Sequence, residues 1–276
     1  MNESSFNQQA FEIALEAVRE QLPLNSPGMG QFPPIPLQVF DTLPSTNQTL
    51  WELLNQGATV PTMVIAGQQT AGRGQWGRQW QSQKGGLYLS LALAPKLQAL
   101  DSAQLTMCSA WGIATALRTY AIPVSVKWPN DLLLKGRKLG GILTQTRVQQ
   151  GQITKAVVGV GINWSNDVPE SGINLRSFWQ PEPSPTVTSI EMLAAIVLQG
   201  LLSGYQLWSE EGMNSLLPRY LALFNYQGSQ VMVEGNPGII TGVTPRGELR
   251  VHLHHTPTPK EILLKPGTIS LGYRSC

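Results

Sequence analysis

The stretch Thr70–Trp80, TAGRGQWGRQW, concentrates residue types that bind anions. It holds three glycines and two arginines and has no acidic residue. Glycines let backbone N–H groups converge on an anion, and the planar guanidinium groups of Arg73 and Arg78 suit carboxylate or phosphate. We therefore expect a loop that wraps a negatively charged ligand. A solvated basic hairpin is the alternative, because its composition is similar.

The glycines of this stretch have the G-x-G-x-x-G spacing of dinucleotide-binding turns. That fold needs a helix opening at the third glycine and an acidic residue about 20 positions later. Gly77 is followed instead by a second glycine pair and an alternating strand pattern over 87–93, and residues 92–97 include no Asp or Glu. The dinucleotide interpretation therefore fails. A Walker A loop is excluded as well, because Arg78 stands where that motif has lysine.

Three further stretches place reactive or adaptable residues at strand ends. Lys127-Trp-Pro-Asn-Asp131 follows an apolar strand, and a lysine held against Trp and Pro is partly desolvated, so its charge acts more strongly on a nearby anion. The segment 138–142 is KLGGI, and 159–163 is GVGIN, whose small residues permit close backbone approach. Asn163 can donate and accept together, which suits an adenine edge. As an ordinary strand-end residue it would need no ligand.

Hydrophobic periodicity predicts the elements that position these stretches. Helical spacing is found over 6–21, 45–57, 101–120, 188–208 and 212–224, with capping boxes at 45–48 and 188–191 and a disturbance at Pro218. Strand patterns are found over 39–41, 62–67, 87–93, 124–128, 132–134, 139–147 and 155–163. Because strands and helices do not alternate regularly, we predict an α+β fold with a mixed, largely antiparallel sheet and helices on one face.

The chain changes character after Gln227. Short strand patterns separated by Gly/Pro turns follow at 231–233, 239–244, 248–252 and 262–264, which predicts a small barrel-like module. We therefore expect an N-terminal helix and Pro-rich segment over 1–36, a main domain that carries the chemistry over 37–225, and a β-rich C-terminal domain over 226–276.

Bulk composition narrows the class of protein. The 276 residues have a formal net charge of +2, and only 13% are charged, which gives no electrostatic signature for general nucleic-acid binding. Two cysteines, Cys108 and Cys276, suggest a reducing compartment. Residues 1–10 lack the features of a signal peptide, and no apolar window is long and uninterrupted enough to span a bilayer. We therefore expect a soluble cytoplasmic protein without membrane contact.

Taken in order, five motifs resemble those of biotin–protein ligases. They are STN at 45–47, QTAGRGQWGRQW at 69–80, KWPND at 127–131, KLGGIL at 138–143 and GVGIN at 159–163. The likeness covers about residues 37–276, and the pairing of the arginine–glycine loop with KWPND is its most specific part. It implies a catalytic domain similar to class II aminoacyl-tRNA synthetases and a C-terminal domain similar to an SH3 barrel.

The resemblance also implies a reaction and its partners. Biotin and ATP, with Mg²⁺, would give biotinyl-5′-AMP and pyrophosphate. A lysine of a biotin carboxyl carrier domain of acetyl-CoA carboxylase would then attack the mixed anhydride and release AMP. Lys127 and Arg73 would be catalytic through positioning and electrostatics.

Binding roles follow from the same motifs. The biotin-binding residues would be Ser45, Thr46, Asn47, Gln69, Gly72, Arg73, Gly74, Gln75, Lys127 and Gly141. The ATP-binding residues would be Arg73, Trp76, Arg78, Lys127, Asn130 and Asn163. Asp131 would orient Lys127 or belong to the Mg²⁺ shell.

Two loop positions depart from the pattern. Many family members carry arginine where this chain has Gln75, so a hydrogen-bonding residue replaces a charged one. Trp76 replaces a more basic residue and would stack on adenine or cover the site. Residues 1–36 are too short for the winged-helix domain by which some members repress transcription, so we expect no repression and no sequence-specific DNA binding.

Two other functions remain open on the sequence. A lipoyl- or octanoyl-transferring relative would use the same fold. A non-enzymatic metabolite or nucleotide sensor would use the same anion-binding residues, although binding alone poorly explains Lys127 between two anion-binding elements.

Overall fold

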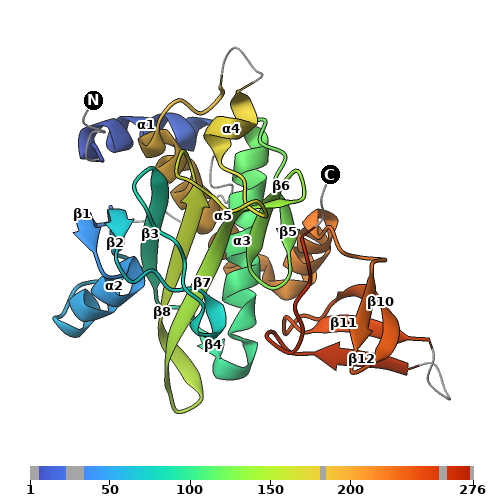
Figure 1. Ribbon diagram of the computed structural model, residues 1–276. Helices are drawn as coiled ribbons and strands as arrows, with labels where there is room; N and C mark the ends of the chain where they lie inside the picture. The colour runs from blue at the N-terminus through green and yellow to red at the C-terminus, as the bar shows by residue number, and fades with distance from the viewer. Residues whose placement is uncertain (1–5, 23–33, 181–184, 255–259, 274–276) are drawn as a thin grey trace.

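The computed structural model describes residues 6–22, 34–180, 185–254 and 260–273. An eight-stranded sheet forms its centre, in the order β1-β2-β3-β8-β7-β6-β5 with β4 paired to β8 (Figure 1). The strands are β1 Leu37–Leu43, β2 Met63–Gln69, β3 Gly86–Leu93, β4 Leu97–Gln98, β5 Ser125–Lys127, β6 Asp131–Leu134, β7 Arg137–Gln149 and β8 Gln152–Asn163. The β1–β2 pair is parallel and the other described pairs are antiparallel. This confirms the predicted mixed, largely antiparallel sheet.

Helices cover both faces of this sheet. They are α1 Gln8–Gln21, α2 Thr46–Asn55, α3 Ala103–Thr119, α4 Leu175–Trp179 and α5 Ile190–Leu223, with single 3-10 turns at Gln75–Gly77 and Ala99–Asp101. α3 and α5 pack together against one face, whereas Leu50 and Leu54 of α2 pack on Val64 and Val157 of the other (Figure 1). The prediction of helices on one face is therefore wrong. Because α2 covers the second face of the sheet, β3 is buried at every position.

The break of α5 falls between the two helices that the sequence predicts, over 188–208 and 212–224, whereas its start differs from the prediction and Pro218 does not disturb the helix. Its N-cap is Ser189, whose side chain accepts a hydrogen bond from a backbone N–H three residues later. Glu191 accepts from the backbone N–H of Asn7 instead of closing a capping box. The helical path breaks at Gly212, where φ is 70°, while Pro218 lies inside the following helical part. A glycine can take this left-handed conformation at low cost, so the break falls there.

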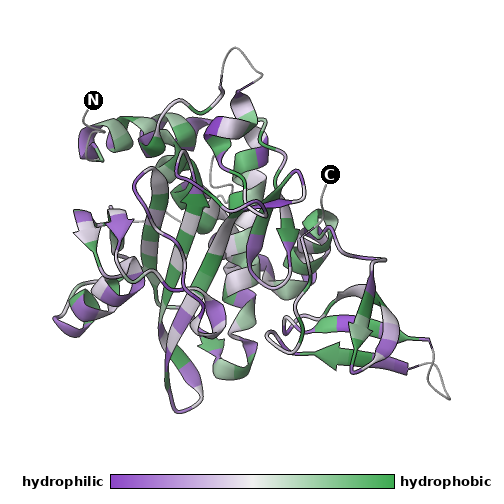
Figure 2. Cartoon of the chain, viewed as in Figure 1, coloured by the Kyte–Doolittle hydropathy of each residue, from purple (hydrophilic) through white to green (hydrophobic). Residues whose placement is uncertain are grey.

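The apolar character of α5 belongs to the protein core. The helix is long and apolar enough to cross a membrane by length and composition, but 72% of its most apolar window is buried inside the protein. Figure 2 shows hydrophobic residues along the central strands and hydrophilic residues at the tip of the β7–β8 hairpin. The pattern is that of one sheet packed between helices.

A second, four-stranded antiparallel sheet follows the main domain. Its strands β9 Gln230–Val233, β10 Asn236–Val243, β11 Leu249–Leu253 and β12 Lys260–Leu264 have the order β12-β11-β10-β9. It lies beside the β5–β6 end of the large sheet (Figure 1). The buried indole of Trp128 donates a hydrogen bond of 2.8 Å to the carbonyl of Gly247, which joins the KWPND turn to this module. The β-rich C-terminal unit is confirmed, and its boundary at 226 stays a prediction. Most of the predicted Pro-rich segment, at 23–33, lies outside the described residues.

Candidate active site

One cavity of about 320 Å³ is lined by residues from all five sequence motifs. Its size falls in the range of roughly 300–1,000 Å³ that small-molecule sites occupy. The charged residues of its lining are Arg73, Arg78, Lys127, Lys138 and Asp131. Four cations against one carboxylate make the lining net positive, so the cavity suits an anionic ligand.

The arginine–glycine loop is a hairpin whose tip reaches the cavity. The backbone N–H of Gly74 donates to the carbonyl of Arg78 at 2.7 Å, and that of Trp80 donates to Gly72 at 3.0 Å. Arg73 and Arg78 are exposed and line the cavity. The loop therefore combines both sequence interpretations, since it is a basic hairpin and it also faces a binding cavity. Gly72 and Gly74 take part in the backbone hydrogen bonds of this hairpin.

The start of α2 forms one end of the cavity. Ser45 is the N-cap residue by position, but its side chain makes no capping hydrogen bond, and Gln48 donates to Glu52 instead. Gln69 replaces the predicted capping box, because its Oε1 accepts from the backbone N–H of Thr46 at 2.8 Å. Ser45, Thr46 and Gln69 all line the cavity, as the resemblance implies.

Asn47 is held by residues that the sequence did not single out. It is 3% exposed, and its Nδ2 donates to the carbonyl of Leu143 and to Oε1 of Gln145. Ser90, which is fully buried on β3, donates to Oδ1 of Asn47 at 2.6 Å. Ser90 and Gln145 fix the orientation of the amide. Polar residues inside apolar strand patterns were the available signal for both.

Two glycines of the GVGIN motif leave room for side chains from elsewhere. A Cβ at Gly159 would collide with the amide of Asn47, and one at Gly161 would lie 2.5 Å from Nε1 of Trp80. β8 therefore carries no side chain at these points, so that Asn47 and Trp80 can lie against its backbone. Trp80 lines the cavity, and its buried Nε1 has no hydrogen-bond partner among the residues that the structure describes.

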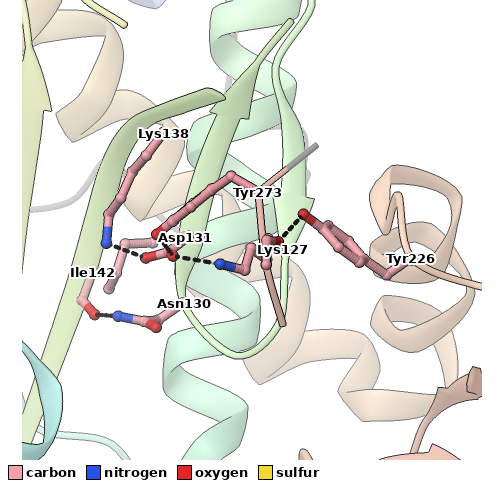
Figure 3. A network of polar contacts seen from close by, with 8 residues as sticks. Lys127, Asn130, Asp131, Lys138, Ile142, Tyr226 and Tyr273 are labelled. Carbon is pink, nitrogen blue, oxygen red and sulfur yellow. Dashed lines mark hydrogen bonds and ion pairs between the residues drawn. The ribbon is translucent and has the colours of Figure 1, made fainter. Parts of the chain in front are cut away.

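Lys127 stands at the end of β5, buried to 5% exposure, and lines the cavity (Figure 3). Its Nζ lies 3.6 Å from Oδ2 of Asp131. The pKa of Lys127 is lowered to about 8, first by burial and then by the cations Lys138 and Arg78, while Asp131 opposes the change. A buried ammonium with one loose ion pair keeps much of its attraction for a bound anion.

Asp131 is occupied by protein donors on both oxygens (Figure 3). Its Oδ1 lies 2.6 Å from Nζ of Lys138, and its Oδ2 accepts a hydrogen bond of 2.7 Å from the hydroxyl of Tyr273. Among the described residues, no group of three or more His, Cys, Asp or Glu side chains could hold a metal ion. Of the two predicted roles, orientation of Lys127 fits these contacts, and Mg²⁺ ligation does not.

The two asparagines predicted to bind ATP lie in different environments. Asn130 lines the cavity, and its Nδ2 donates to the carbonyl of Ile142 at 2.7 Å (Figure 3). Asn163 is 6% exposed and is absent from the cavity lining. Its Nδ2 donates to the carbonyls of Lys138 and Ile173, and its Oδ1 accepts from Asn166. The adenine role of Asn163 is therefore not supported, because its amide already has internal partners.

Trp76 covers the cavity from the hairpin tip. It is 61% exposed, and its ring lies so close to Gly267 that a Cβ there would be 2.9 Å from the indole. Gly267 opens a segment, 267–271, that forms another wall of the cavity. The covering role of Trp76 agrees with this contact, and stacking on adenine stays a prediction. No sequence motif pointed to this C-terminal wall. Gln75, Gly74 and Gly141 line the cavity as the resemblance implies, whereas Gly72 does not.

Comparisons with known proteins agree with this arrangement. Residues 39–163 match the Biotin/lipoate A/B protein ligase family. The chain is 33% identical over 249 residues to the "Bifunctional ligase/repressor BirA" of Salmonella typhimurium, which covers 81% of this chain and 77% of that protein. The protein of the same name from Bacillus subtilis is 39% identical over 135 residues, or 47% of this chain and 42% of its own length. The match thus spans less than half of the Bacillus relative.

A solved structure matches over most of the fold. The "Biotin protein ligase from Aquifex aeolicus in complex with biotin and ATP" superposes with a TM-score of 0.68 at 26% identity, covering 87% of this chain and 99% of that one. The similarity therefore extends over most of this chain and nearly all of the Aquifex chain. By its matched motifs, its similarity to more than two thirds of the Salmonella relative and its fold, the chain belongs to the biotin/lipoate A/B protein ligase family, in its biotin–protein ligase branch.

Proposed function

We propose that the protein activates biotin with ATP and transfers it to a lysine of a biotin carboxyl carrier domain, as in acetyl-CoA carboxylase. The observation that carries the proposal is the buried ammonium of Lys127, which shares one cavity with the α2 cluster Ser45–Asn47 and the loop arginines. The α2 cluster offers donors and acceptors for a ureido group. The cations offer charge for a carboxylate and a triphosphate.

The chemistry follows from where these groups lie. In the first step, a carboxylate oxygen of biotin attacks the α-phosphorus of ATP, the bond to the β-phosphate oxygen breaks, and pyrophosphate leaves. Lys127 would stabilise the charge that builds on the α-phosphoryl oxygens, with Arg73 and Arg78 closing from the loop. Mg²⁺ would enter with the nucleotide phosphates, since Asp131 is already engaged.

The second step needs no further cofactor. The acceptor amine attacks the carbonyl carbon of biotinyl-5′-AMP, the bond between that carbon and the phosphate oxygen breaks, and AMP leaves with the proton lost by the amine. The mixed anhydride must stay in the cavity until the acceptor arrives. The loop tip with Gln75 and Trp76, which faces segment 267–271, supports that retention.

One assay separates the candidate functions. Protein, Mg-ATP, either biotin or lipoate, and a carrier domain are mixed, and the carrier is weighed by mass spectrometry. A biotin mass addition supports the proposal, a lipoyl addition supports the lipoyl-transferring alternative, and an unchanged carrier supports a sensor.

Loss of Lys127 should abolish transfer while the fold stays intact. We expect Lys127→Ala to reduce carrier labelling by at least about a hundredfold, because the ammonium acts on the developing charge. Lys96→Ala is the matched control, since Lys96 is exposed and outside the cavity. Near-normal turnover of Lys127→Ala would reject the assigned role. The absence of sequence-specific DNA binding and of membrane contact, and the cytoplasmic location, stay predictions.

A further inference from the structure

The C-terminal segment after β12 returns to the large sheet and completes the cavity. Residues 267–271 line the cavity, and the chain then continues to Tyr273, which lies beside Lys127 and Asp131 (Figure 3). The hydroxyl of Tyr226 anchors the segment by donating to the carbonyl of Gly272 at 2.7 Å. The small β-module therefore delivers one residue to the immediate surroundings of the buried lysine.

Tyr273 contacts both members of the Lys127–Asp131 pair. The Nζ of Lys127 lies 3.4 Å from the centroid of the tyrosine ring, within the range of a cation–π contact. The tyrosine hydroxyl donates to Oδ2 of Asp131 at 2.7 Å. Tyr273 itself is absent from the cavity lining, so it lies behind Lys127 and does not face the ligand.

These contacts explain why the lysine is not tied tightly to its carboxylate. Oδ1 of Asp131 forms an ion pair with Nζ of Lys138 at 2.6 Å, and Oδ2 accepts a hydrogen bond from the Tyr273 hydroxyl at 2.7 Å. Nζ of Lys127 stays 3.6 Å from Oδ2. A close ion pair would neutralise the ammonium before a substrate arrives. The hydroxyl therefore competes with Lys127 for Oδ2, and the ring holds the ammonium in place without neutralising it.

We propose that Tyr273 is a positioning residue for Lys127, through which the C-terminal segment keeps the ammonium available to the α-phosphoryl group. The inference rests on the proposed function for its effect on catalysis, while the contact itself can be tested without any substrate. Because burial and the neighbouring Asp131 raise the pKa of Tyr273, its hydroxyl stays a donor throughout the neutral range.

The groups that face Lys127 come from four elements. They are Asp131 on β6, Lys138 on β7, Arg78 in the hairpin and Tyr273 in the C-terminal segment. Burial is the largest cause of the lowered Lys127 pKa, at about 8. Removal of the ring would expose the ammonium, and removal of the hydroxyl would let Asp131 approach it. Both changes raise the pKa of Lys127.

The first experiment measures pyrophosphate release with biotin, Mg-ATP and an excess of carrier domain, which removes the retained adenylate, in Tyr273→Phe and Tyr273→Ala. We expect kcat to fall by about threefold in Tyr273→Phe and by about tenfold or more in Tyr273→Ala, with KM for both substrates nearly unchanged. The alkaline limit of kcat should move to higher pH in both variants. Tyr205→Phe on α5 is the matched control, because Tyr205 contacts Trp208 outside the cavity.

The second experiment measures the reactivity of Lys127 without substrate. Limited acetylation with acetic anhydride at several pH values, followed by peptide mass spectrometry, gives its titration midpoint, with exposed Lys96 as the internal reference. The midpoint should rise from about 8 toward 10.5 in both Tyr273 variants and stay unchanged in Tyr205→Phe. An unchanged midpoint, or an unchanged kcat in an active protein, would overturn the inference. If the wild-type protein releases no pyrophosphate, the proposed function fails, and the midpoint alone still decides whether Tyr273 sets the state of Lys127.

Discussion

Gln75 is an uncharged residue at the tip of the basic hairpin, at a position where the family resemblance predicts an arginine. It lines the cavity together with Trp76 and Lys127. We expect Gln75→Arg to slow the escape of biotinyl-5′-AMP by about tenfold, because hydrogen bonds to a charged group are worth roughly 1.5–3 kcal/mol, against about 1 kcal/mol for a neutral pair. The dissociation rate can be followed by competition with unlabelled biotin.

A control separates this local effect from a change in net charge. Gln83→Arg adds the same charge at an exposed position after the hairpin, outside the cavity lining. It should leave the dissociation rate unchanged. Equal rates for Gln75→Arg and the wild type would contradict the idea that the missing charge weakens retention.

The lowered pKa of Lys127 gives the first step a characteristic pH dependence. The ammonium form predominates below about pH 8, and the neutral amine predominates above it. Only the cation can stabilise negative charge on the α-phosphoryl group, so kcat for pyrophosphate release should be constant below this pH and fall as the pH rises through it. The measurement is a pH profile at saturating biotin and ATP. A rate that stays flat to pH 10 would show that the charge of Lys127 does not matter.

At the scale of elements, β8 acts as a surface on which two side chains from other elements rest. A methyl group at Gly159 would displace the amide of Asn47. We therefore expect Gly159→Ala to raise KM for biotin by about tenfold or more and to change KM for ATP much less. The measurement is pyrophosphate release at varied biotin and at varied ATP.

The same strand offers a comparison for this variant. Lys155 lies toward the other end of β8, outside the cavity. Lys155→Ala should therefore leave KM for biotin and KM for ATP unchanged. If Gly159→Ala raised the two KM values equally, the effect would be a general loss of structure, and the specific role of Asn47 in the biotin end of the cavity would be refuted.

At the scale of the whole molecule, the two sheets are joined beside the buried lysine. The Trp128 indole donates to the carbonyl of Gly247, and both groups are buried at this contact. We expect Trp128→Phe to lower the free energy of unfolding by about 1–3 kcal/mol and also to reduce pyrophosphate release, because a buried carbonyl loses its donor next to Lys127. Urea unfolding and the activity assay measure the two effects.

A second tryptophan separates stability from function. Trp208 donates to Gln104 at 2.8 Å on the far side of α3, outside the cavity. Trp208→Phe should lower the free energy of unfolding by a similar amount and leave the rate of pyrophosphate release unchanged. Equal losses of activity in the two variants would show that the junction at Gly247 has no special connection to the site.

Much of this architecture could be predicted from local sequence. Strands such as β3 and β8 have strong periodicity, and the motifs around Asn47, Arg73 and Lys127 do line one cavity. Local patterns could not show which faces of the sheet are covered. The helix on the second face is α2, whose contacts with β3 and β8 join segments far apart along the chain.

Local patterns also could not show the hydrogen-bond partners within the site. An amide that can donate and accept favours an adenine role for Asn163, which stays a prediction, yet Lys138, Asn166 and Ile173 use that capacity in the structure. Gln69 provides the bond at the start of α2 that a local capping box was expected to provide. Each case depends on a tertiary hydrogen bond, and sequence spacing carries no record of such partners.

The closing wall of the cavity has a consequence for protein synthesis. Segment 267–271 and Tyr273 are translated long after the residues at 45–47, 73–78 and 127–131 that they complete. A nascent chain on the ribosome therefore lacks a finished compartment until residue 273 has emerged from the exit tunnel. The wall that this structure shows around the cavity is therefore the last part of it to be synthesised.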